Sequence, residues 1–158
     1  MKPRLPTSGV NGVADLPLKP TLSLVTLGVA DLARAKKFYS DLGWQPVEQP
    51  SDGVVFFELD GIMLSLFPRE ELAKDAGVEN SNPGFSGISL AHIVGSETEA
   101  DAALAHAVKC GATLLKPAQK VFWGGYSGYF TDPDGHLWEV AYNPFAKFDE
   151  NGIMRMSA

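Results

Sequence analysis

The sequence is poor in cysteine and has no long apolar run. Cys110 is the single cysteine among 158 residues, so neither an internal disulfide nor a cysteine-rich zinc site can form. No stretch approaches the roughly 20 apolar residues that cross a bilayer. The first twenty residues hold four prolines and lack the apolar segment of a secretory signal. We therefore expect a cytoplasmic protein with no membrane partner.

Basic residues are also in short supply. Lysine and arginine total 13 against 19 aspartate and glutamate residues, which gives a formal net charge of −6. A nucleic-acid-binding protein needs a basic surface that displaces counterions from phosphates, so we expect no nucleic-acid partner. Hydrophobic residues make up 45% of the chain and charged residues 20%, a composition that can bury a core.

One folded domain is expected over residues 21–145, between tails at 1–20 and 146–158. Within it one order of elements, a strand, a helix and three strands, occurs twice. The first copy covers residues 21–67, the second covers 86–145, and 68–85 is a linker with a short helix at 69–76.

In the first copy, an apolar strand over 22–29 precedes Asp31, which fits a helix N-cap, and Gly43 ends that helix. Strand-like runs follow over 44–48, 54–59 and 62–67, with a hairpin turn at Asp60-Gly61.

In the second copy, a β-rich run over 88–94 precedes Ser96, and Glu99 completes a capping box for a helix that Gly111 ends. Strand-like runs then cover 113–115, 126–131 and 137–142. The turn at 132–135 has the sequence Asp-Pro-Asp-Gly, which favours a hairpin.

This duplicated order, together with four short motifs, resembles the vicinal oxygen chelate superfamily of glyoxalases, bleomycin-resistance proteins and extradiol dioxygenases. The motifs are Val29-Ala-Asp-Leu32, Phe38-Tyr39, Leu42-Gly43 and the segment from Phe130 to Glu139. The resemblance implies an α+β fold in which two βαβββ modules form a curved mixed sheet around a cup, with the helices outside. It also implies a homodimer, and a divalent metal often held in the cup.

Glu139 matches the last metal-ligand position of that family, four residues after Gly135. The equivalent residue of the first module is Ser65, four residues after Gly61. Seven residues before the N-cap Asp31 lies Leu24, where the family offers a histidine. One carboxylate without an imidazole is too few ligands for a catalytic metal, which normally takes about three.

The second module leaves the fourth position open. Aligning the two helix N-caps pairs Leu24 with Ser89, whereas aligning the two helix-end glycines pairs it with His92. The first alignment is favoured because the cap adjoins the strand. In the second, His92 and Glu139 would remain as a two-ligand remnant and as weak candidates for a divalent metal.

Glu139 is expected to point into the cup, because strand alternation places it opposite Trp138 and Val140, which suit packing against helices. There it can act as a catalytic acid or base, or it can be a structural carboxylate in a salt bridge.

Two further sets of residues are candidates for ligand binding. The segment 120–129 combines a Gly-Gly pair with Trp123, Tyr126 and Tyr129, whose rings can stack on a planar or apolar ligand. Met63, Ser65 and Phe67 would share the cup face of the first module. For both sets, packing in the core or in a dimer contact is the alternative.

These observations favour a protein of the glyoxalase/bleomycin-resistance type that binds a small apolar or aromatic molecule in the cup without the usual catalytic metal. Two alternatives stay open. One is a glyoxalase-like lyase or an extradiol-type dioxygenase that uses Glu139 with a non-standard metal site. The other is a vestigial cup with an interaction or regulatory role.

Overall fold

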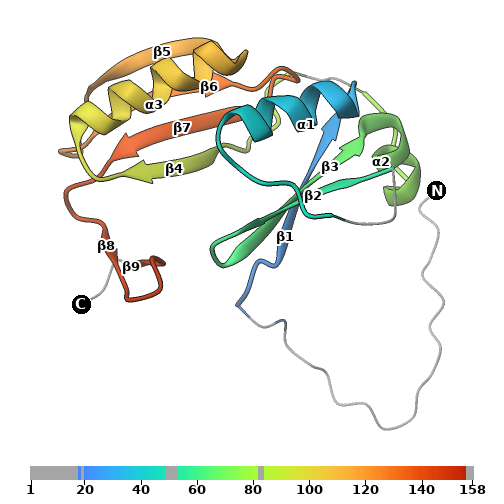
Figure 1. Cartoon of the computed structure of the whole chain (residues 1–158), viewed down its shortest axis with the longest axis horizontal. Coiled ribbons are helices and arrows are strands. Elements are labelled where there is room, and N and C mark those ends of the chain that lie inside the picture. The colour runs from blue at the N-terminus through green and yellow to red at the C-terminus, as the bar shows by residue number, and fades with distance from the viewer. Residues whose placement is uncertain (1–17, 19, 49–52, 82–83, 156–158) are drawn as a thin grey trace, which may run out of the picture.

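A computed structural model describes residues 18, 20–48, 53–81 and 84–155 of the chain. The expected N-terminal tail therefore lies almost entirely outside the described residues. The first module contains β1 (Leu24–Val29), α1 (Leu32–Asp41), β2 (Val55–Leu59) and β3 (Ile62–Pro68) (Figure 1). Its three strands form one sheet in the order β1-β3-β2, with β1 parallel and β2 antiparallel to β3.

The strand expected over 44–48 does not form. Only Pro46 makes an isolated bridge, to Phe57, and the Val47 amide donates to the Phe56 carbonyl at 2.8 Å. A proline has no N–H group to donate to a ladder, which limits pairing at this position. The half-buried Trp44 instead stacks on Tyr39, with ring centroids 5.6 Å apart.

The second module has the same order of elements with one additional strand. It contains β4 (Leu90–Val94), α3 (Glu97–Cys110), β5 (Thr113–Lys120), β6 (Tyr126–Thr131) and β7 (Leu137–Tyr142). The four strands form a second sheet in the order β4-β7-β6-β5. The linker carries the expected short helix, α2 (Arg69–Ala76), and the C-terminal segment expected as a tail contains a small hairpin of β8 (Lys147–Phe148) and β9 (Met154–Arg155).

Local sequence signals set the helix ends. The Asp31 carboxylate accepts from the Arg34 amide at 3.0 Å, and the Ser96 hydroxyl accepts from the Glu99 amide at 3.1 Å. The Glu99 side chain reaches back to the Gly95 amide, which completes the cap one residue earlier than in a standard capping box. Gly111 ends α3 in the left-handed region, with a φ of 118°.

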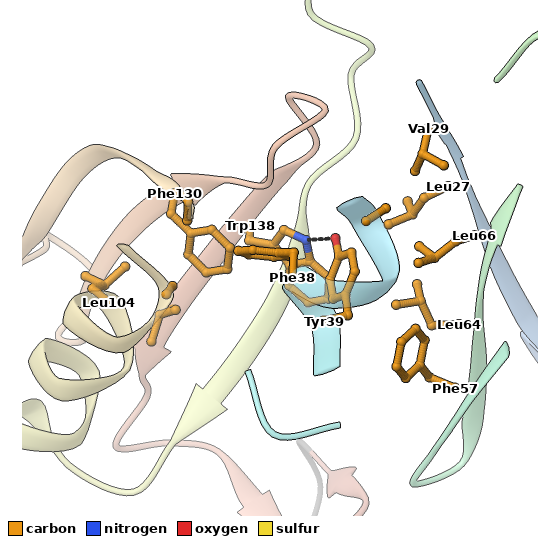
Figure 2. Close-up of a cluster of buried hydrophobic side chains, with 14 of the residues drawn as sticks. Leu27, Val29, Phe38, Tyr39, Phe57, Leu64, Leu66, Leu104, Phe130 and Trp138 are labelled. Carbon is orange, nitrogen blue, oxygen red and sulfur yellow. Dashed lines mark hydrogen bonds between the residues drawn. The ribbon is translucent and has the colours of Figure 1, made fainter. Parts of the chain in front are cut away.

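Helix α1 lies between the two sheets (Figure 2). Phe38 and Tyr39 point from it toward Phe130 and Trp138 on one side and toward the side chains of β1, β2 and β3 on the other. Tyr39 is fully buried, and Phe130 and Trp138 stack with centroids 6.1 Å apart. The α+β fold built from two related modules is therefore confirmed, with βαββ order plus a bridge at Pro46 in the first module and βαβββ order in the second, and one core joins the modules.

A hydrogen-bonded chain reinforces this junction. The Trp138 indole N–H donates to the Tyr39 hydroxyl at 3.1 Å, and that hydroxyl donates to Asp132 Oδ2 at 2.7 Å. The His136 Nδ1 lies 2.7 Å from the same oxygen. In the same turn, Asp134 Oδ1 accepts a hydrogen bond from the Ala30 amide. The turn at 132–135 therefore contacts the residues just before α1.

Within the described parts of the chain, none of the helices is both long and apolar enough to cross a membrane.

Candidate ligand-binding face

The register of the second sheet places Glu139 on the side of the sheet that faces away from α3. Phe130, Trp138 and Val140 are buried on the α3 side, so their neighbours Tyr129 and Glu139 point to the opposite side. We call this opposite side the cup-side face of the second sheet. It carries Ala91, Lys116, Gln119, Ser127, Tyr129, Glu139 and Ala141.

Tyr129 and Glu139 form the polar centre of this face. They stand opposite each other on β6 and β7, and the Tyr129 hydroxyl donates to Glu139 Oε2 at 2.8 Å. Both side chains are half-buried, whereas the neighbouring Ala91 is exposed. The hydrogen bond to the carboxylate, burial and the negative charge of Glu139 together raise the pKa of Tyr129, so this phenol stays protonated and donating.

Trp123 borders the same face because Gly125 leaves room for it. A Cβ atom at Gly125 would lie 1.9 Å from Cζ3 of the Trp123 indole, so the ring occupies the space of a side chain. Gly125 directly precedes β6, whose first residue Tyr126 points to the α3 side, so we place the indole at the end of the opposite, cup-side face. Trp123 is 36% exposed and can contact a ligand.

Tyr126 does not join these residues. Its hydroxyl donates to Asp101 of α3 at 2.8 Å, which places the ring on the α3 side of the sheet. The three aromatic residues expected to line one pocket are therefore divided, with Trp123 and Tyr129 on one side and Tyr126 on the other. The reason is the alternation of β6, since positions 126 and 129 differ by an odd number of residues.

Met63, Ser65 and Phe67 lie on the side of the first sheet that faces away from α1. Leu64 and Leu66 between them point to α1 and are buried. Ser65 is only 2% exposed, and its hydroxyl lies 2.6 Å from the Thr26 hydroxyl on β1. One of these hydroxyl groups donates to the other, and the side chains of Met63 and Phe67 beside them form a largely apolar surface.

The parallel strand pairs decide the alignment of the modules. Thr26 stands opposite Ser65 on β3, and Ala91 stands opposite Glu139 on β7. Because Ser65 and Glu139 are equivalent, Thr26 corresponds to Ala91, and Leu24 therefore corresponds to Ser89. This is the alignment that the helix N-caps favoured.

His92 consequently lies on the wrong side of the sheet to share a ligand with Glu139. It stands opposite Val140 and lines a cavity of about 170 Å³ beside Ala103 and His106 of α3. A larger cavity of about 660 Å³ between the two sheets also includes His92, with Trp44 and Trp138. The register therefore places His92 and Glu139 on opposite sides of the second sheet and does not bring them together.

The donor set does not fit a catalytic metal. The four family positions hold Leu24, Ser65, Ser89 and Glu139, and only the last is a strong ligand. In the part of the chain that the structure describes, no three histidine, cysteine, aspartate or glutamate side chains are grouped so that they could bind an ion.

Lys116 is a candidate that sequence reasoning missed. It stands opposite Tyr129 on β5, on the cup-side face, and is exposed. The pairing of β5 with β6 shifts on both sides of Lys116, so counting residues from the hairpin does not place it.

Ser65 and Glu139 lie on two faces that point away from each other, although Met63 and Ala91 of these faces also line the cavity of about 660 Å³ between the sheets. Side chains of both sheets point toward α1, which lies between them (Figure 2). The face with Ser65 and the face with Glu139 are the reverse sides of these two sheets. Within one chain, each of these two faces can therefore cover only one side of a ligand.

Comparisons with known proteins agree with this architecture. The sequence profile of the Glyoxalase/Bleomycin resistance protein/Dioxygenase superfamily matches residues 21–140. The crystal structure of a glyoxalase-related enzyme from Fulvimarina pelagi has 34% sequence identity and a TM-score of 0.81, over 89% of this chain and 100% of that one. A glyoxalase/bleomycin resistance protein/dioxygenase from Nocardioides has 25% identity and a TM-score of 0.67, over 80% of this chain and 85% of that one.

A lactoylglutathione lyase from Agrobacterium tumefaciens shares the fold, with 23% identity and a TM-score of 0.60 over 79% of this chain and 95% of that one. A search of curated proteins gave no match. With its profile match, its duplicated modules and these structural neighbours, the chain belongs to the glyoxalase/bleomycin resistance protein/dioxygenase superfamily.

Proposed function

We propose that this protein binds a small apolar or aromatic molecule on the cup-side face of the second sheet, at Tyr129 and Glu139, without a resident catalytic metal. The observation that carries the proposal is the half-buried hydrogen bond between these two side chains, on a face that Trp123 borders. An apolar ring contact combined with a few fixed polar groups is the usual composition of a small-molecule site.

The polar pair favours a ligand that donates a hydrogen bond. Tyr129 already directs its proton to Glu139 Oε2, so both groups present lone pairs to a ligand. Among the described residues, Glu139 Oε1 has no hydrogen-bond partner. Trp123 adds a flat apolar surface on which an aromatic ring can stack.

The proposed binding unit is a homodimer. A single wall leaves most of a ligand in water, whereas specific sites bury 70–90% of a ligand's surface. The face with Met63, Ser65 and Phe67 is a second, largely apolar wall that points away from Glu139 in its own chain. A twofold dimer that sets this wall opposite Glu139 of the other copy would create two equal sites.

The alternative of a metal-dependent lyase or dioxygenase finds little support in the donor set. Its test is metal content. Purified protein incubated with Zn²⁺, Ni²⁺, Mn²⁺ or Fe²⁺ and then desalted is expected to keep less than about one ion per ten chains, since one carboxylate holds such ions weakly. Stoichiometric metal that is lost in Glu139→Ala would overturn the proposal in favour of this enzyme class.

Indole and 1-methylindole are the simplest probes for the proposed site, because they share a ring but only indole has an N–H donor. Titrations followed by NMR are expected to show indole binding about tenfold tighter than 1-methylindole, and Glu139→Gln to reduce this difference. Trp123→Ala is expected to weaken both. Tyr126→Phe is the control, because it removes a tyrosine hydroxyl from the opposite side of the same strand.

Unchanged indole affinity in both Glu139→Gln and Trp123→Ala would contradict the proposed site. Absence of any aromatic ligand in a broad fragment screen would instead support the vestigial cup with an interaction role.

Complementation tests the homodimer. Glu139→Gln impairs one wall and Met63→Lys impairs the other, so each variant alone should bind indole poorly. Co-expressed copies of the two variants would form heterodimers with one intact site. About a quarter of the wild-type sites are then expected, from random pairing of two-site dimers. A monomer in sedimentation velocity, or no recovery of sites, would contradict the shared site.

A further inference from the structure

Three side chains of different chemistry stand in one row across the cup-side face. Lys116 of β5 is opposite Tyr129 of β6, and Tyr129 is opposite Glu139 of β7. A cation, a phenol and a carboxylate therefore follow one another across three neighbouring strands. The family resemblance implies a role only for the glutamate, and Lys116 is connected with it only through the pairing of β5 with β6.

Lys116 and Glu139 are not paired with each other. Among the residues that the structure describes, Lys116 takes part in no ion pair, and Glu139 accepts its hydrogen bond from Tyr129. Strands in a sheet are about 4.8 Å apart, so the backbones of β5 and β7 are separated by roughly 10 Å. A lysine side chain is long enough to cross part of this distance, yet its ammonium group remains available to another anion.

The row has an aromatic neighbour at one end of the face. Trp123 lies over Gly125, which is four residues from Tyr129 along the chain. This separation is roughly 13 Å for an extended strand, with Ser127 between them. A stacked ring beside Trp123 and a short polar chain reaching the row would together span that length.

We infer that the ligand of this face is an aromatic carboxylic acid that also carries an amino group or a similar hydrogen-bond donor. The inference rests on the proposed function and adds the chemical class of the ligand. Its carboxylate pairs with Lys116, its donor pairs with Glu139, and its ring stacks on Trp123. A charge-assisted hydrogen bond at each end favours this class over a neutral aromatic molecule.

Three indole compounds, titrated in isothermal titration calorimetry, separate the contribution of Lys116 to the binding affinity from that of Glu139. L-Tryptophan has both the carboxylate and the ammonium group, indole-3-propionate has only the carboxylate, and tryptamine has only the ammonium group. We expect L-tryptophan to bind the wild-type protein tightest. Lys116→Gln should weaken L-tryptophan and indole-3-propionate about tenfold and leave tryptamine within about twofold.

Glu139→Gln should give the complementary pattern, with the largest losses for L-tryptophan and tryptamine and a smaller loss for indole-3-propionate, whose only donor is the ring N–H. Lys120→Gln is the matched control. It removes the same charge from the same strand, but Lys120 stands opposite Tyr126 on the α3 side of the sheet. This control should leave all three affinities unchanged.

The outcomes distinguish this inference from the proposed function. Tryptamine that binds as tightly as L-tryptophan, with no effect of Lys116→Gln, would overturn the ligand class while indole binding at Glu139 still held. Equal losses of indole-3-propionate affinity in Lys116→Gln and Lys120→Gln would also overturn it, because only the general positive charge of β5 would then matter. Failure of indole itself at Glu139 would overturn both.

Discussion

The hydroxyl of Tyr39 donates a hydrogen bond to Asp132 Oδ2 at 2.7 Å, across 93 residues and between the two modules. Tyr39 is fully buried on α1, and Asp132, 3% exposed, begins the turn between β6 and β7. The Trp138 indole completes the chain by donating to the same hydroxyl. The junction of the modules thus depends on one polar network inside an aromatic cluster.

Tyr39→Phe is expected to destabilise the protein by about 2 kcal/mol, because it leaves the buried Trp138 N–H without an acceptor and removes one donor from Asp132. The measurement is the free energy of unfolding in urea. Tyr126→Phe is the matched control, since it removes another tyrosine–aspartate hydrogen bond, to an exposed carboxylate. Equal effects of the two substitutions would contradict the importance of the buried network.

Asp132 also predicts how stability depends on pH. Burial opposes ionisation of Asp132, but hydrogen bonds from His136 and Tyr39 outweigh burial and hold the pKa of its carboxyl below its usual value. A folded-state pKa below the unfolded value gives stability that is complete above the unfolded value and is lost as the pH falls through the folded one. The free energy of unfolding should therefore fall below about pH 4.

Asp132→Asn should flatten this acid-induced loss in urea titrations between about pH 5 and pH 2.5. Asp149→Asn is a useful comparison. The pKa of Asp149 is also lowered, chiefly by the Ile153 amide, but the side chain lies on the surface hairpin. A steeper loss of stability with acid in Asp132→Asn than in the wild type would show that the sign is wrong.

The N-cap of α1 is the next test, since this helix contacts both sheets. Asp31→Ala should cost about 1 kcal/mol of stability, because the Arg34 amide loses its acceptor. Asp41→Ala removes an exposed carboxylate from the other end of α1, where it pairs with Lys37, and should cost less than about 0.5 kcal/mol. A reversed order of the two effects would contradict the assignment of the cap.

Gly125→Ala is predicted to displace Trp123. The new methyl group would meet the indole at 1.9 Å, a separation that requires the ring to move. We expect a change in tryptophan fluorescence and weaker indole binding. Gly53→Ala should change neither, because a Cβ atom at Gly53 has open space around it. Unaltered fluorescence and affinity in Gly125→Ala would remove Trp123 from the site.

Much of this architecture could be predicted from local sequence signals. Asp31, Ser96 and Gly111 mark helix ends through their own backbone contacts, so the repeated order of elements was readable. The position of Glu139 followed from alternation along β7, which needs only the identity of its buried neighbours.

Sequence-based predictions fail where the pairing of strands decides whether a strand forms or which side of the sheet a residue faces. The sequence places Tyr126 and Tyr129 in one aromatic segment, but alternation along β6 puts them on opposite sides of the sheet. Lys116 cannot be assigned to a face from the sequence, because the irregular pairing of β5 conceals its partner. The strand expected at 44–48 was reduced to one bridge at Pro46, since hydrophobic patterning does not report whether a neighbouring strand can pair.

The most direct test of the proposed site is a crystal structure of the protein in complex with indole. We expect the indole N–H group to be directed to Glu139, with the ring on the Trp123 side of this carboxylate and with Met63 and Phe67 of a second copy on the far side. Indole bound instead in the cavity between the sheets, against Trp44, Trp138 and His92, would contradict it.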